Sequence, residues 1–137
     1  MIKNNIIVNR DGNIKYYNYA DQLHREDGPA VEFADGSKFW YINGKLHRED
    51  GPAKEYKTGT KEWWVNGKLH RVYGPAVEHP NGDKSWWING ERHREDGPAL
   101  EWDSDKKAWW INGINIDIMK NIFKAYILYN LPRNIKY

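Results

Sequence analysis

Residues 43–65 read NGKLHREDGPAKEYKTGTKEWWV, and this stretch decides the fold because it recurs along the chain with no change of length. The histidines that mark each copy, spaced by 23 residues, are His24, His47, His70 and His93. Tryptophans keep the same spacing at Trp40, Trp63, Trp86 and Trp109, with Tyr17 one period earlier. A fixed period of this length predicts a repeat architecture in which each copy is one supersecondary unit.

Two turn signals divide each copy. Asn43-Gly44 and its three later counterparts are typical of a type I′ turn, which requires positive φ at both central residues. Asp35-Gly36 and its counterparts mark a second turn, for which Ser104-Asp105 in the fourth copy is a poorer sequence. Short strands lie between the turns, at about residues 29–34 and 37–42 in the first copy. We therefore expect a mainly β fold: a row of antiparallel β-hairpin repeats that form one elongated, twisted sheet.

The two ends of the chain depart from the repeat. Residues 1–22 are expected to be a degenerate N-terminal half-repeat, with Asp11-Gly12 one residue out of phase and Ala20-Asp21 in place of Asn-Gly. Residues 23–113 hold the four hairpin repeats. Residues 114–137 are expected to form a C-terminal capping α-helix and a tail, with Asp117 as N-cap and Leu131-Pro132 as the end of the helix. This helix either packs on its own sheet or contacts another chain.

The loop at Asp35-Gly36 determines which side chains share a face of the sheet. A two-residue loop pairs Phe33 with Lys38 and Val31 with Trp40. The more apolar face is then our expected core. It comprises Val31, Phe33, Lys38, Trp40 and Ile42, with the counterparts Tyr56, Trp63, Val65, Val77, Trp86, Ile88, Leu100, Trp102, Trp109 and Ile111. A loop of another length would swap this assignment, because a slip of one residue turns every side chain over.

The other face is the expected binding surface, since it combines alanines, a glutamate row and a second aromatic row. Its candidate partner-binding residues are Tyr41, Trp64, Trp87, Trp110, Glu32, Glu55, Glu78 and Glu101. Tryptophan and tyrosine dominate protein-binding hot spots, which favours an exposed contact surface. The aromatic row also has a structural interpretation, in which its rings pack against alanine, glutamate stems and arginine planes within the sheet.

The repeat resembles a known family. Asn-Gly-Lys-Leu-His, followed by Ala-Asp-Gly-Ser-Lys-Phe-Trp, is similar to the MORN repeat over about residues 8–113, and closer still to variant MORN units of bacterial, phage and large DNA virus proteins. Arg-Glu-Asp-Gly-Pro-Ala stands where ordinary MORN units carry a glycine soon after the histidine, so the resemblance is to a divergent subgroup. It implies rows of antiparallel hairpins that serve as interaction or assembly modules.

Composition narrows the classes of function. The 137 residues include 21 basic and 19 acidic ones, so the net charge of +2 gives no strong electrostatic reason to bind nucleic acid or an anionic membrane. No window approaches the roughly 18 apolar residues of a spanning helix, no signal peptide is evident, and there is no cysteine. We therefore expect a cytoplasmic protein, in the host cytoplasm if the chain is viral.

The recurring His-Arg-Glu-Asp group suggests catalysis, but its repetition argues against that interpretation. A catalytic constellation is normally assembled once, at one cleft, whereas this group occurs three times and is altered after His70, where Val72-Tyr73 replaces Glu-Asp. We expect histidine and arginine to pack on or hydrogen-bond the turns, with aspartate holding the Gly-Pro bend. Histidines about 10 Å apart cannot share a zinc ion with bonds of about 2.0–2.1 Å. We expect no cofactor, no metal site and no enzymatic activity.

The favoured hypothesis is a non-enzymatic protein–protein interaction module, with a possible homodimer that covers apolar surface left open by the helix. In a phage or virus the partner would be a host factor, such as a defence component. One alternative is an aromatic repeat protein that binds glycans or a cell wall, because Trp-Trp-Ile-Asn-Gly is similar to choline-binding repeats. A second alternative is an enzyme that uses the His-Arg-Glu-Asp surface.

Overall fold

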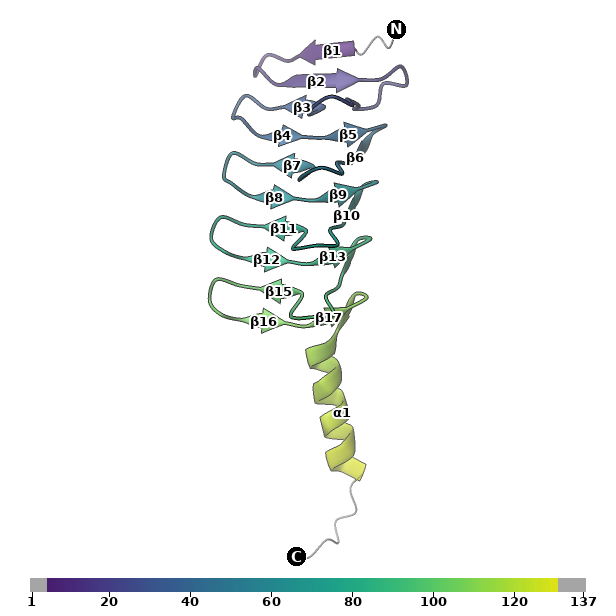
Figure 1. Ribbon diagram of the computed structural model, residues 1–137, viewed down its shortest axis with the longest axis vertical. Helices are drawn as coiled ribbons and strands as arrows, with labels where there is room; N and C mark the ends of the chain where they lie inside the picture. The colour runs from purple at the N-terminus through teal and green to yellow at the C-terminus, as the bar shows by residue number, and fades with distance from the viewer. Residues whose placement is uncertain (1–4, 131–137) are drawn as a thin grey trace, which may run out of the picture.

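The computed structural model describes residues 5–130, with side chains as far as residue 126. Its main feature is a ten-stranded antiparallel sheet in which successive hairpins follow one another in sequence order (Figure 1). In spatial order its strands are β1 (Asn5–Val8), β2 (Ile14–Tyr17), β3 (Val31–Glu32), β4 (Lys38–Phe39), β7 (Lys54–Glu55), β8 (Lys61–Glu62), β11 (Val77–Glu78), β12 (Lys84–Ser85), β15 (Leu100–Glu101) and β16 (Lys107–Ala108). The expected fold class, mainly β with hairpin repeats and a C-terminal helix, is confirmed.

Smaller elements complete each repeat. Four two-stranded hairpins are formed by β5 (Tyr41–Ile42) with β6 (Lys45–Leu46), β9 (Trp64–Val65) with β10 (Lys68–Leu69), β13 (Trp87–Ile88) with β14 (Glu91–Arg92), and β17 (Trp110–Ile111) with β18 (Ile114–Asn115). The only helix within the described residues is α1 (Ile116–Asn130). No helix in that part of the chain is long and apolar enough to cross a membrane.

Each repeat contains one continuous strand and one interrupted strand. Only Trp40 separates β4 from β5; its amide donates to the carbonyl of Ala53 at 2.8 Å, and its carbonyl accepts from the amide of His47 at 3.1 Å. β4, Trp40 and β5 therefore run as one strand (Figure 1), whose partner is divided into β6 and β7 by residues 48–52. Trp63 and Trp86 make the same bonds in the next two repeats. At each interruption, the segment that begins with arginine leaves the sheet as a loop.

The Asn-Gly turns have the expected geometry. Asn43 and Gly44 have φ of 47° and 76°, and the three later pairs also have positive φ at both residues. This is the requirement for a type I′ turn. The amide of Gly67 also donates to the carbonyl of Leu46 at 2.8 Å, so the turn of one repeat is bonded to the hairpin of the repeat before it.

The other turn is one residue longer than expected. The amide of Phe33 donates to the carbonyl of Ser37, and the amide of Gly36 donates to the carbonyl of Phe33, both at 2.9 Å. Gly36 has φ of 95°, whereas Asp35 is not in the positive-φ region. Residues 34–36 thus form a three-residue loop that ends in a left-handed glycine, which is a common hairpin connection.

This loop changes the register of every repeat. Val31 pairs with Phe39, and Glu32 pairs with Lys38. The expected pairings of Phe33 with Lys38 and of Val31 with Trp40 are therefore wrong by one residue. Because cross-strand partners share a face, the first strand of each hairpin is turned over relative to our expectation.

The register defines two faces with different side chains. The loop face, from which residues 48–52 and their counterparts project, carries in the first repeat Ala30, Glu32, Lys38, Trp40 and Ile42. The open face carries Val31, Phe33, Phe39 and Tyr41, and the Phe33 and Phe39 rings are in contact at a centroid distance of 4.9 Å. Each group recurs at the period of 23 residues.

The interior consists of small side chains, and the expected core is wrong except at Val31. Ala30, Ala53, Ala76 and Ala99 are fully buried, and Val31 is 3% exposed. No larger side chain among the described residues is fully buried. The expected aromatic core residues are divided between the two faces, and Trp102 and Trp109 are exposed. The physical reason is that a single sheet without a second layer leaves both faces partly open, so the large aromatic side chains stay partly exposed, while the alanines where each loop rejoins the sheet are enclosed.

The leading half-repeat follows the same plan with one extra residue. Its second turn is a three-residue loop, residues 19–21, in which the amide of Asn18 donates to the carbonyl of Gln22 at 2.9 Å. This loop replaces the two-residue Asn-Gly turn and shifts the preceding residues by one position. Tyr16, rather than Tyr17, therefore stands at the position of Trp40, with its amide bonded to the carbonyl of Ala30 at 2.9 Å.

The helix α1 extends beyond the last hairpin and does not cover the sheet (Figure 1). Its apolar side chains Ile118, Met119, Ile122, Phe123 and Tyr126 are all exposed. Of the two placements left open by the sequence, packing of α1 on its own sheet is therefore not seen for the described residues. Its expected end at Leu131-Pro132 lies outside them.

Asn115, and not Asp117, caps the helix. The Asn115 side-chain oxygen accepts from the amides of Asp117 at 3.0 Å and Ile118 at 3.2 Å. The Asp117 carboxylate instead accepts from the amide of Trp109 at 3.0 Å, which ties the first turn of α1 to the last repeat. The expected N-cap is wrong by two positions, because the helix begins directly after β18.

Candidate binding surface

The guanidinium of the first residue holds each loop of the loop face together. Arg25 Nε donates to Asp27 at 2.8 Å, and its Nη1 donates to Glu32 at 2.9 Å and to the carbonyl of Pro29 at 3.3 Å. Arg48 and Arg94 make the same three bonds in their own loops. The hydrogen bond and charge of Arg25 lower the pKa of Asp27. The contact with the Gly-Pro bend is made by arginine, through the carbonyl of Pro29, and the expected hold of aspartate on that bend stays a prediction.

The same guanidinium lies over an aromatic ring of the repeat before. The stacked pairs, with distances from Cζ to ring centroid, are Arg25 on Tyr16 at 4.1 Å, Arg48 on Trp40 at 4.1 Å, Arg71 on Trp63 at 3.8 Å and Arg94 on Trp86 at 4.1 Å. These distances are within the range of cation–π contacts. A Cβ at Gly51 would come within 2.9 Å of Arg48 Cζ, so glycine gives the guanidinium room to fold back.

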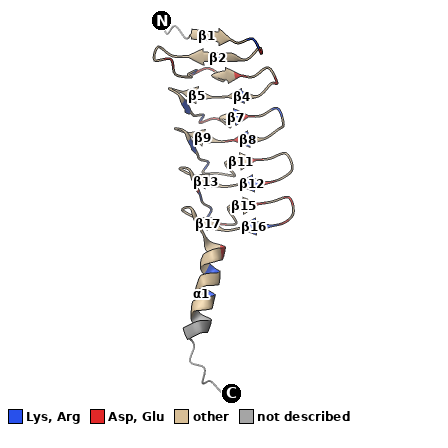
Figure 2. Ribbon diagram, turned by 180° about the vertical axis from the view of Figure 1, so that it is seen from behind, with Lys and Arg blue, Asp and Glu red and all other residues tan. Residues whose placement is uncertain are grey.

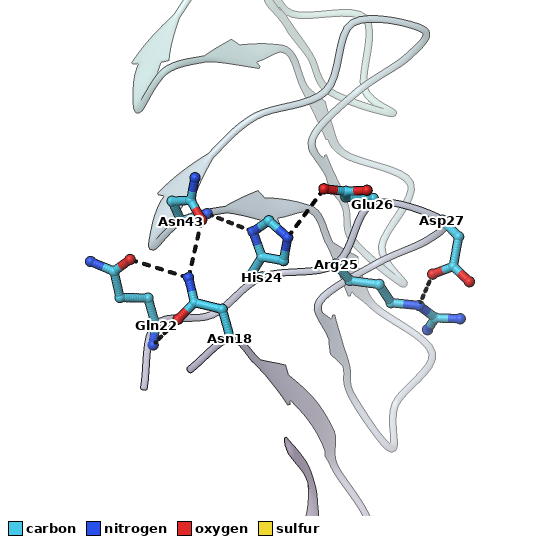
Figure 3. A network of polar contacts seen from close by, with 7 residues as sticks. All are labelled: Asn18, Gln22, His24, Arg25, Glu26, Asp27 and Asn43. Carbon is cyan, nitrogen blue, oxygen red and sulfur yellow. Dashed lines mark hydrogen bonds and ion pairs between the residues drawn. The ribbon is translucent and has the colours of Figure 1, made fainter. Parts of the chain in front are cut away.

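The histidines join each loop to the following hairpin. Nδ1 of His24 accepts from the amide of Asn43 at 3.0 Å, and its Nε2 lies 3.6 Å from Glu26 (Figure 3). Asn18 and Gln22 extend this network on the other side of Asn43 (Figure 3). The later histidines accept from the amides of Asn66, Asn89 and Asn112 at 3.1–3.2 Å. The expected hydrogen bond between histidine and turn is confirmed.

The third loop, residues 71–75, differs from the others. Arg71 keeps its bonds to Glu78 at 2.8 Å and to the carbonyl of Pro75 at 3.0 Å. Tyr73 stands where the other loops have aspartate, and Val72 stands where they have glutamate. Tyr73 is 94% exposed and Val72 is 62% exposed. This loop therefore presents an apolar tip on the same internal frame.

Three clefts lie between successive loops of the loop face. The first cleft, between the loops of Arg25 and Arg48, has a volume of about 470 Å³. The second, between those of Arg48 and Arg71, has about 480 Å³, and the third, between those of Arg71 and Arg94, has about 600 Å³. The residues that line them from the sheet are Trp40 and Ile42, then Trp63 and Val65, then Trp86 and Ile88. Their volumes are within the range of ligand-binding pockets.

Charge is distributed unevenly around these clefts. The side chains of Glu26, Asp27, Glu49 and Asp50 line the first cleft and are between 73% and 85% exposed. Val72 and Tyr73 line both the second and the third cleft. The acidic character of the loop face is therefore greatest at the first cleft, and the apolar character is greatest at the other two.

A ladder of alternating charge crosses the sheet beside the clefts. In the observed register, neighbouring strands from β3 to β16 place Glu32, Lys38, Glu55, Lys61, Glu78, Lys84, Glu101 and Lys107 directly opposite one another in turn. Basic and acidic residues accordingly recur from hairpin to hairpin (Figure 2). Opposite charges in such cross-strand pairs each stabilise a sheet by roughly 0.2–1 kcal/mol.

The predicted glutamates belong to this framework. Glu32, Glu55, Glu78 and Glu101 each accept from the arginine of their own loop at 2.8–3.0 Å. They lie at the base of the loops, and the exposed carboxylates are those of the loop tips. Binding by these four glutamates stays a prediction, and their visible role is to position the arginines.

The predicted aromatic row lies on the open face, and the expectation that it shares a surface with the glutamates is wrong. Trp64 Nε1 donates to Glu62 at 2.8 Å, and Lys54 Nζ lies 5.1 Å from the Trp64 ring centroid. Trp87 Nε1 donates to Ser85 at 2.7 Å. These contacts agree with the structural interpretation of the row, and a binding role for it stays a prediction.

The two ends of the aromatic row are also engaged. Burial raises the pKa of Tyr41. Arg92 lies between two rings, with its Cζ 4.8 Å from the centroid of Trp87 and 5.2 Å from that of Trp110. The row is therefore half-buried among cations of its own chain.

Sequence reasoning did not assign Val72 and Tyr73 to the binding surface. Their signal was present, because they alone replace Glu-Asp in four otherwise equivalent loops. Their exposure and their place between two clefts make these two side chains candidates for contact with a partner. No protein-family model matches the chain, and no curated protein is detectably similar to it in sequence.

Proposed function

We propose that this chain is a non-enzymatic protein–protein interaction module whose partner binds the loop face, with Val72 and Tyr73 as the central contact. The observation that carries the proposal is the exposure of these two side chains, 62% and 94%, at the tip of a loop with a cleft on each side. Contiguous apolar patches rimmed by polar residues mark interaction sites, and Val72 and Tyr73 are neighbours at one loop tip. Tyrosine is enriched at the centre of such sites because its rigid ring buries a large area at small entropic cost.

The resemblance of the repeat to MORN units supports the same class of function, since those repeats serve as interaction and assembly modules. We propose that the units are of the variant MORN type. In a phage or virus the partner would then be a cytoplasmic host factor, such as a defence component. A second copy of the chain, seated on the apolar side chains of α1, is compatible with this role.

The two alternatives receive less support. A glycan platform needs open tryptophan faces and free indole donors, whereas Trp64 and Trp87 donate to Glu62 and Ser85. An enzyme on the His-Arg-Glu-Asp surface needs reactive side chains that are available to a substrate. In the described repeats the arginines bond within their own loop and lie over a ring of the repeat before, and the histidines bond to the turn of the following hairpin.

Site-specific photocrosslinking in the native cell tests the proposal. A photoreactive phenylalanine analogue replaces Tyr73, and in a matched control it replaces Trp102, which is 41% exposed on the open face. We expect a discrete crosslinked protein from position 73, and its loss when Val72→Glu is added to that chain. Circular dichroism checks that each variant keeps its fold. Crosslinking from position 102 alone would move the site to the open face, and no product from either position would overturn the proposed function.

A further inference from the structure

The clefts of the loop face recur at a spacing that fits one kind of extended chain. Each repeat adds two strands to the sheet, so neighbouring clefts are about 9.4–9.8 Å apart. A polyproline II helix has three residues per turn and rises about 3.1 Å per residue, so its side chains repeat every ~9.3 Å. Residues i, i+3 and i+6 of such a segment meet three successive clefts with an accumulated mismatch of about 1 Å at most.

Other backbone conformations fit the clefts less well. Two turns of an α-helix span about 10.8 Å, which is longer than the spacing of the clefts. If one helical side chain fits the first cleft, the side chain four turns on is displaced from the third cleft by roughly 2–3 Å. In a β-strand, residues i and i+3 point to opposite faces. We infer that the loop face binds a polyproline II segment of a partner protein, with one side chain in each cleft. This inference rests on the proposed function and names the chemistry of the partner.

The charges of the clefts predict the order of side chains in that segment. Four carboxylates and two guanidiniums line the first cleft, and these six groups have a net charge of −2. Two carboxylates and two guanidiniums line each of the others, a balance of zero. Both guanidiniums of the first cleft are also bonded to the glutamates Glu32 and Glu55 beneath them. The partner therefore places a basic side chain in the first cleft and apolar side chains in the second and third.

Tyr73 and Val72 suit such a segment because they stand between the second and third clefts. A polyproline II backbone makes no internal hydrogen bonds, so its carbonyls are available to donors. The exposed phenol of Tyr73 offers a flat ring to proline and a hydroxyl donor to a carbonyl. The tryptophans that line the clefts from the sheet supply the aromatic base that proline-rich segments use elsewhere.

Fluorescence polarisation with labelled synthetic peptides tests the inference. The first peptide is Arg-Pro-Pro-Leu-Pro-Pro-Leu-Pro-Pro, whose basic and apolar side chains recur at every third residue. The second, Arg-Pro-Leu-Pro-Leu-Pro-Pro-Pro-Pro, has the same composition with a period of two. We expect the second to bind at least tenfold more weakly. Tyr73→Ala should lower the affinity for the first peptide at least tenfold. Trp102→Ala on the open face should leave the affinity for this peptide unchanged.

The charge assignment has its own control. A third peptide, with glutamate in place of arginine, should bind wild type at least tenfold more weakly than the first. The double variant Glu26→Gln/Glu49→Gln should reduce that difference to less than threefold, because it removes two exposed carboxylates of the first cleft. An unchanged difference would overturn the assignment of the basic side chain to that cleft.

Three other results would overturn the inference: equal affinity for the first two peptides, no binding of either at millimolar concentration, or tighter binding of a helical peptide with leucines seven residues apart. The proposed function fails separately. Crosslinking at position 73 together with no peptide binding overturns only the polyproline II inference. The absence of any crosslinked protein overturns the proposed function.

Discussion

The third loop of the array and the three loops that carry Arg-Glu-Asp-Gly share one frame and differ at their tips. In all four, arginine lies over an aromatic ring and bonds to a glutamate of the sheet. The third loop replaces the tip carboxylates with Val72 and Tyr73 and exposes both. The arginine contacts are therefore sufficient to maintain the loop conformation, and the residues at the tip can vary without loss of the loop.

This difference separates structure from function within one repeat. The contacts that persist in every loop are those at the base, where Arg71 bonds to Glu78 and to the carbonyl of Pro75. The contacts that change lie at the solvent-exposed rim, where ion pairs contribute little to stability. Replacement of the rim therefore costs the fold little, and it creates an apolar patch on a surface of otherwise alternating charge.

The largest expected effect comes from removal of a base contact. Arg48→Ala removes the guanidinium from Trp40 and leaves the half-buried Glu55 without its partner, so we expect a loss of about 2–3 kcal/mol in the free energy of unfolding. Arg71→Ala should cost slightly less, because Arg71 has no partner at the rim equivalent to Asp50. Urea unfolding followed by tryptophan fluorescence measures both losses.

Arg10→Ala is the matched control for these two variants, because Arg10 is an exposed arginine of the leading turn and belongs to none of the four loops. We expect a change within about 0.5 kcal/mol for it. A loss for Arg71→Ala as large as that for Arg48→Ala would show that the two kinds of loop depend on arginine equally.

Much of the fold could be predicted from the sequence because its local rules are strong. A type I′ turn admits few residue pairs, so Asn-Gly at a constant spacing fixed the hairpins and their order. The assignment of side chains to the two faces was wrong because the loop at Asp35-Gly36 is one residue longer than expected. Whether the Asp35-Gly36 turn spans two residues or three depends on the φ of Asp35, and aspartate is compatible with either conformation.

The candidate site was harder to predict for a related reason. A slip of one residue in register exchanges the two faces, so the glutamates and the second aromatic row were assigned together although they lie on opposite sides. The clefts depend on loops that leave the sheet between β6 and β7, and periodicity alone does not show that a strand is interrupted. The departure at Val72-Tyr73 was visible in the sequence, but its exposure was not.

Restoring the missing rim is the second test of the comparison. The double variant Val72→Glu/Tyr73→Asp gives the third loop the sequence of the others, and we expect it to raise the free energy of unfolding only slightly, because solvent screens an exposed ion pair. The same variant should lose peptide binding at the loop face. Stability is measured by urea unfolding and binding by fluorescence polarisation.

The reciprocal variant, Glu49→Val/Asp50→Tyr, places the apolar tip on the second loop. It should remain folded and should bind less well to the peptide that begins with arginine, because the first cleft loses two carboxylates. Unfolding of either double variant would show that the frame of the loop depends on its tip residues.

The smallest expected difference between the two kinds of loop is in sensitivity to acid. Arginine holds the pKa of Asp27, Asp50 and Asp96 below the ordinary value of 3.8. A carboxyl group with a lowered pKa in the folded state adds stability above its unfolded pKa, and that stability is lost as the pH falls through the folded pKa. The third loop has no such group. The urea concentration at the unfolding midpoint of the wild type should therefore decrease as the pH is lowered below about 4. This decrease should be less steep in Asp50→Asn and steeper in Val72→Glu/Tyr73→Asp. Identical slopes in the three proteins would show that these loop carboxylates do not contribute to stability.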